Sequence, residues 1–74
     1  MLPSTTDPRW TRLIENPGRY SYNMLALRVM MQRISLKVRL GMTVNERRDV
    51  LSEVQSFFAK NERMLQDDIR SIFG

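Results

Sequence analysis

Helix-breaking residues occupy few positions in this chain of 74 residues. The three prolines and three glycines lie at Pro3, Pro8, Pro17, Gly18, Gly41 and Gly74. Two long stretches, 19–40 and 42–73, therefore contain neither residue, and apolar residues recur along them every three or four positions. The sequence has no alternating runs of β-branched residues. Because the observed spacing is the period of an α-helix, the sequence predicts an all-α fold in a single small domain, 1–74.

The first helix is predicted to be short, at 8–16, after a flexible leader at 1–6. Asp7 can cap its N-terminus. Pro8 suits the first helical position because its missing N–H would have no partner there. The Pro17-Gly18 pair then disfavours continuation of the helix.

Two longer helices are predicted at 21–40 and 44–73, joined as an antiparallel hairpin by a three-residue turn. Gly41 suits the left-handed conformation that follows a helix end. Thr43 and Glu46 have the spacing of a capping box, which marks the next helix start. Apolar residues then stay in phase to the end of the chain, which favours one continuous helix over two. They are Leu51, Val54, Phe58, Leu65, Ile69 and Ile72.

The two hairpin helices differ in predicted length, at roughly 30 Å and roughly 45 Å for a rise of 1.5 Å per residue. The longer helix therefore needs a cover for its overhang, and the short first helix is expected to supply it with Trp10, Leu13 and Ile14. Along the shared length we expect three apolar contacts, Leu27 with Phe58, Met31 with Val54, and Ile34 with Leu51.

The helix at 21–40 carries apolar residues on two opposite faces. The face predicted to meet the third helix consists of Met24, Leu27, Met31, Ile34 and Val38. The second face, centred about 170° away at 100° per residue, consists of Tyr22, Leu25, Val29, Leu36 and Leu40. One hairpin partner covers only one face, and soluble monomers rarely expose an apolar row of this size. The second face is therefore predicted to bind another chain.

Three occupants of the second face are compatible with the sequence. They are a second copy in an antiparallel four-helix, coiled-coil-like homodimer, a helix of a heterologous protein, and the first helix of the same chain. Cations flank this face, with Arg28 and Arg39 on one side and Arg33 and Lys37 on the other. We interpret these cations as the basic rim of a protein contact, because their aliphatic stems can cover apolar surface.

The charge balance allows an acidic protein, a nucleic acid or an anionic membrane surface as partner. Lys and Arg number 12 against 8 Asp and Glu, a net charge of +4, and 16–45 contains no acid. The alternative function is thus a nucleic-acid-binding regulator using Arg28, Arg33, Lys37, Arg39, Arg47 and Arg48. The turn after the helix at 21–40 argues against this function, because it does not fit a DNA-binding helix-turn-helix motif. That motif expects a small residue where this chain has Lys37 and an apolar residue where it has Arg47.

The absence of His and Cys excludes disulfides, thiolate or imidazole metal sites, and His- or Cys-based catalysis. A chain this short is not expected to form a catalytic pocket, so the sequence predicts no enzyme, cofactor, metal or small-molecule substrate. Four charges within 22–42 argue against a bilayer span, and the N-terminus has no signal-peptide pattern. We therefore expect a cytoplasmic interaction protein, such as an adaptor, chaperone, inhibitor, small regulator or assembly subunit.

Overall fold

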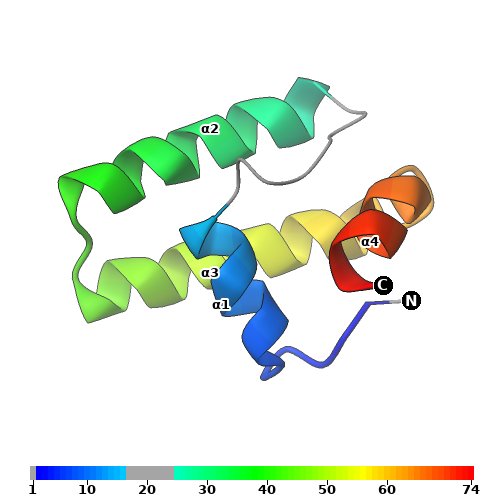
Figure 1. The fold of residues 1–74 in the computed structure, drawn as a ribbon, viewed down its shortest axis with the longest axis horizontal. Helices are drawn as coiled ribbons and strands as arrows, with labels where there is room; N and C mark the ends of the chain where they lie inside the picture. The colour runs from blue at the N-terminus through cyan, green and yellow to red at the C-terminus, as the bar shows by residue number, and fades with distance from the viewer. Residues whose placement is uncertain (1, 17–24) are drawn as a thin grey trace.

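The computed structural model describes residues 2–16 and 25–74, which form four helices and no strand (Figure 1). The helices are α1 (Pro8–Glu15), α2 (Leu25–Leu40), α3 (Val44–Lys60) and α4 (Gln66–Phe73). The all-α fold class is thereby confirmed. The beginning of the predicted helix at 21–40, with Tyr22 and Met24, lies outside the described residues.

The capping signals read from the sequence act as predicted. The Asp7 carboxylate accepts a hydrogen bond from the Arg9 backbone N–H at 2.9 Å, and Pro8 is the first residue of α1. Thr43 Oγ1 accepts from the Glu46 N–H at 3.1 Å, while Glu46 Oε1 accepts from the Thr43 N–H at 3.3 Å. Gly41, with φ of +90°, closes α2 in the left-handed region. These local bonds set where α1 and α3 begin.

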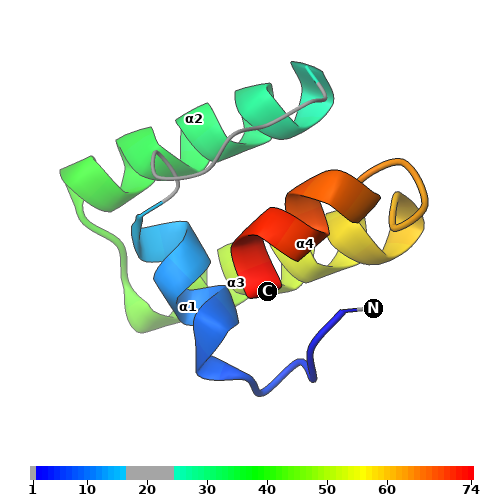
Figure 2. The ribbon, with the colours of Figure 1, turned by 45° about the vertical axis from the view of Figure 1, so that its right-hand side comes forward.

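Helices α2 and α3 run in opposite directions on either side of the 41–43 connection (Figure 1). The short α1 packs closely against both of them. The sequence placed α1 over the overhanging end of a hairpin formed by the two longer helices, whereas in the structure α1 packs against both α2 and α3. Helix α4 folds back beside α3, and its C-terminal end lies near the start of the described chain in both views (Figure 1 and Figure 2).

The prediction of one continuous helix across 44–73 is wrong. Helix α3 ends at Lys60, and a turn at 61–65 separates it from α4. Asn61 caps α3, since its backbone N–H and its Nδ2 both donate to the Phe57 carbonyl, at 3.1 and 3.0 Å. A straight helix of that length would extend about 45 Å, whereas the longest extent of the fold is 31 Å. The turn brings Leu65 and Ile69 back into the core, where they are at most 4% exposed.

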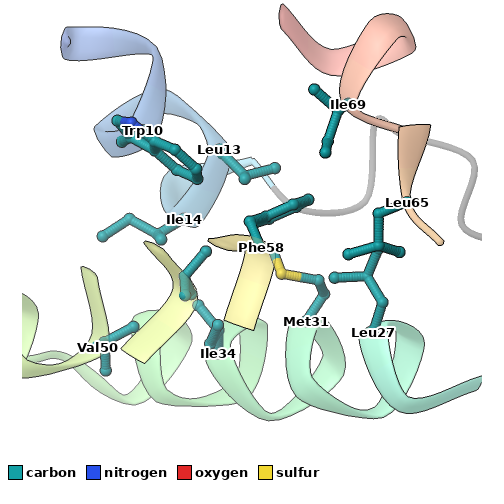
Figure 3. Packing of buried hydrophobic residues seen from close by; sticks show 11 residues of the cluster. Trp10, Leu13, Ile14, Leu27, Met31, Ile34, Val50, Phe58, Leu65 and Ile69 are labelled. Atoms are coloured by element: carbon teal, nitrogen blue, oxygen red, sulfur yellow. The ribbon is translucent and has the colours of Figure 1, made fainter. Parts of the chain in front are cut away.

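One buried cluster joins all four helices. Its apolar members are Trp10, Leu13, Ile14, Leu27, Met31, Ile34, Val50, Val54, Phe58, Leu65 and Ile69. Figure 3 shows Leu27, Met31 and Ile34 projecting from α2 toward the other helices, with Met31 directed at Phe58. Of the six residues expected to pair across the hairpin, Leu51 alone is only partly buried, and its neighbour Val50 is buried in its place.

The segment before α1, predicted from the sequence to be a flexible leader, contacts the rest of the fold at residues 2–5. Trp10 Nε1 donates to the Ser4 carbonyl at 3.0 Å, and Gln55 Nε2 of α3 donates to the Thr5 carbonyl at 2.8 Å. Leu2 packs against the core cluster. The reason is the buried indole, whose N–H needs an acceptor and takes it from this segment.

Candidate interaction surface

The side of α2 that faces away from the core carries large apolar side chains in solvent. We define the outer face of α2 as Leu25, Val29, Leu36 and Leu40, which are 74%, 47%, 56% and 78% exposed. On the opposite side of the same helix, Leu27, Met31 and Ile34 are between 0% and 5% exposed. The two-faced pattern read from the sequence is therefore present in the described part of α2, with one face buried and one open.

The first helix does not cover the outer face. Its apolar residues Trp10, Leu13 and Ile14 are at most 1% exposed and belong to the same buried cluster as Leu27 and Met31. Helix α1 therefore packs on the core side of α2. Of the three occupants compatible with the sequence, the first helix of the same chain is excluded by this packing.

The side chains of the outer face project from an exposed helix side into solvent, and we call this row the apolar ridge of α2. A hollow of about 660 Å³ lies over the 62–74 region, and another of about 240 Å³ lies at the turn between α2 and α3. The apolar residues of the outer face line neither of them. A ridge of this kind can lie along another helix or enter a groove of a partner, which is how amphipathic helices are commonly bound.

The four cations beside the outer face are exposed and carry uncompensated charge. Among the residues that the structure describes, Arg28, Arg33, Lys37 and Arg39 form no ion pair. Helix α2 itself contains no acidic residue. Glu53 of α3 lines a small hollow together with Arg33 and Lys37 without an ion pair. Glu53 is thus a carboxylate that lies near the Arg33 and Lys37 side of the outer face.

The two remaining cations of the alternative nucleic-acid surface lie on α3. Arg47 Nη1 donates to Glu15 Oε1 of α1 at 2.8 Å, an ion pair that connects the two helices. Arg48 is exposed. The structure thus gives Arg47 an intramolecular partner, while the α2 cations keep their positions on the two sides of the apolar ridge.

Sequence reasoning missed a cluster that joins the two ends of the described chain. Arg9 Nη1 donates to the Phe73 carbonyl at 2.6 Å, and its guanidinium lies 5.7 Å from the centre of the Phe73 ring. The same guanidinium binds the Asp7 carboxylate at 2.9 Å. This side-chain bond, with the Arg9 backbone N–H, lowers the pKa of Asp7 to about 2. No sequence signal relates residue 9 to residue 73, because the contact depends on how α4 folds back.

Other kinds of site are not apparent in the parts described. Residues 2–16 and 25–74 contain no group of three or more Asp or Glu side chains placed to hold a metal ion. Within the same ranges, no helix combines the length and the hydropathy needed to cross a membrane.

Comparison with protein-family models, with curated proteins and with solved structures finds no match to this chain. A role for the outer face of α2 is therefore inferred from the geometry and chemistry of the face alone.

Proposed function

We propose that this chain is a small non-enzymatic interaction protein that associates with a second copy or with another protein through the outer face of α2. The observation that supports the proposal is the contrast along one helix, where the outer-face residues are 47% to 78% exposed and the core-facing residues at most 5%. Burying one such aliphatic side chain stabilises a complex by about 1.5–3 kcal/mol. The exposed cations would form the rim of the contact.

Such a protein acts by occupying a surface on its partner, as an adaptor, chaperone, inhibitor, small regulator or assembly subunit does. The ridge of α2 suits this role because the rest of the fold holds it in place. The core side of α2 is already buried in the cluster to which the other three helices also contribute. A helix that is folded before binding loses less conformational entropy on association than one that folds on its partner.

The test compares the parent chain with Val29→Glu/Leu36→Glu, which places two carboxylates on the outer face. The matched control is Ser52→Glu/Ser56→Glu, which adds the same charge at two exposed positions of α3. Light scattering across a concentration series measures self-association, and affinity capture from a cell extract measures binding of other proteins. We expect the outer-face variant to lose the association that the control keeps, while circular dichroism shows equal helicity.

The unpaired cations of α2 favour nucleic-acid binding as the second candidate function. It predicts that duplex DNA binds at physiological salt and that Arg33→Ala/Arg39→Ala weakens this binding. The nucleic-acid hypothesis also predicts that Val29→Glu/Leu36→Glu weakens DNA binding no more than Ser52→Glu/Ser56→Glu does. If DNA binds in this way and the outer-face variant changes no protein association, the interaction proposal is wrong.

A further inference from the structure

We infer that the outer face of α2 binds a helix of a different protein whose own apolar seam is flanked by acidic residues. This inference rests on the proposed function and names the chemistry of the partner. It follows from the width of the apolar ridge, from the charges beside it, and from what a second copy of this chain would offer.

The ridge has the dimensions of a helix–helix seam. At 100° per residue its members lie within roughly 60° of one another, and they follow one another at intervals of four, seven and four residues. Gln32 occupies the seam position in the seven-residue gap. Narrow stripes of this spacing typically contact one helix.

Pairing of α2 with α2 of a second copy would bring cations together. In an antiparallel pair centred between Gln32 and Arg33, Arg28 lies beside Arg39 of the other copy with an axial offset of about 3 Å. Arg33 lies beside its own counterpart at about 1.5 Å. Helix α2 has no acid that could relieve either contact, and Glu53 of α3, which lies near Arg33, forms no ion pair with it. A parallel pair also has only cations on its flanks, so both symmetric arrangements are disfavoured.

The other described surfaces of a second copy do not complement the ridge either. Outside the outer face, the exposed large apolar residues are Val44 and Met64, which belong to different segments. Among the exposed large apolar residues of the described chain, the outer face is therefore the one row at helical spacing, and a second copy offers no other such row to pack against it.

Charge complementarity thus selects an acidic partner helix. Carboxylates on both flanks of its seam would meet Arg28 with Arg39 on one side and Arg33 with Lys37 on the other. The first pair should contribute more to binding, because Glu53 already lies beside the second pair and would repel an incoming acid.

The experiment uses two synthetic helical peptides with the same leucine seam, one flanked by Glu and one by Lys, each labelled for fluorescence anisotropy. We expect the Glu peptide to bind at least about tenfold more tightly at low salt and to lose affinity as salt rises. Arg28→Gln/Arg39→Gln should weaken it by about tenfold, and Arg33→Gln/Lys37→Gln by less. Arg48→Gln/Arg63→Gln removes two exposed cations elsewhere and should leave binding unchanged.

Four results would overturn the inference, and they separate it from the proposed function. A concentration-dependent dimer that Val29→Glu/Leu36→Glu dissociates means that a second copy occupies the face, so the proposed function stands and the inference fails. Equal affinity for the two peptides rejects the role of charge. Binding to phosphatidylglycerol vesicles through these residues, with no binding of either peptide, assigns the face to a membrane. If Val29→Glu/Leu36→Glu changes neither self-association nor the binding of any partner, both the inference and the proposed function are wrong.

Discussion

The rings of Trp10 and Phe73 lie 4.7 Å apart, centre to centre, with their planes inclined by 58°, and this contact joins α1 to the last turn of α4. Phe58 of α3 completes the cluster, at 5.5 Å from Trp10 and 6.1 Å from Phe73. Arg9 adds a hydrogen bond to the Phe73 carbonyl. Three helices therefore meet at one aromatic cluster, which holds α4 against the rest of the fold.

Replacing Phe73 with alanine should weaken the attachment of α4. Phe73 is only partly buried, so we expect a loss of about 2 kcal/mol, below the 3–5 kcal/mol typical of a fully buried phenylalanine. Urea denaturation followed by circular dichroism measures it. Met64→Ala, at a side chain 67% exposed, is the control and should stay within about 0.5 kcal/mol of the parent. Equal effects of the two substitutions would contradict the role given to the ring.

Leu25 and Leu27 provide a matched pair for the two faces of α2. They lie two residues apart, and one is 74% exposed and the other fully buried. We expect Leu27→Ala to cost about 2–5 kcal/mol through the cavity it leaves. That loss is a large part of the free energy of unfolding, which is roughly 4–11 kcal/mol for a domain of this length. Leu25→Ala should alter stability by less than about 0.5 kcal/mol.

Thermal unfolding at low protein concentration measures both leucine variants without a contribution from association. The assignment of the two faces would fail if Leu25→Ala proved the more damaging substitution under these conditions.

The capping box at the start of α3 should be measurable by itself. Thr43→Ala removes the acceptor of the Glu46 N–H, and we expect a loss of about 1 kcal/mol. Thr43→Ser keeps a hydroxyl oxygen in place and should retain most of that stability. Thermal melts of the three proteins provide the comparison, and indistinguishable melting temperatures for the alanine and serine variants would show that the hydroxyl does not act as the cap.

Asp7 should make the stability of the fold depend on pH in the acidic range. Its pKa is lowered from 3.8 to about 2 because Arg9 bonds the charged carboxylate. Since the unfolded chain binds the proton first, the stabilisation is complete above about pH 4 and is lost as the pH falls toward 2. We expect Asp7→Asn, which still offers a capping oxygen, to melt below the parent at neutral pH. This difference should shrink between about pH 4 and pH 2.

The control for Asp7 is the same substitution in an Arg9→Gln background, which removes the side-chain hydrogen bond, the largest cause of the lowered pKa, and keeps the backbone N–H of residue 9. The pH-dependent part of the difference should become smaller there. An unchanged pH dependence in that background would assign it to another group.

The features that sequence reasoning located correctly are those held by bonds between near neighbours. Asp7 caps α1 through Arg9, and Thr43 with Glu46 caps α3. Each bond spans no more than three residues, so the residue types and their spacing contain the needed information. The two-faced pattern of α2 was also readable, because the angular position of a side chain around a helix follows from its number alone.

The end of α3 could not be predicted in this way. Apolar residues on the two sides of Asn61 keep a helical phase, and the same phase results from one helix or from two separated by a five-residue turn. What selects the turn is the burial of Leu65 and Ile69 in a cluster with Trp10 and Phe58. That cluster depends on where α1 lies, which periodicity does not report.

The amino-acid sequence by itself thus determined the helical class, the caps at Asp7 and Thr43, and an α2 with two apolar faces. Local hydrogen bonds and the helical period govern all three. Only the tertiary structure decided that α1 joins the core side of α2, that the chain turns after Lys60, and that Arg9 meets Phe73. These features result from competition among distant segments for the same buried surface, and the side of α2 that no described segment covers is its outer face.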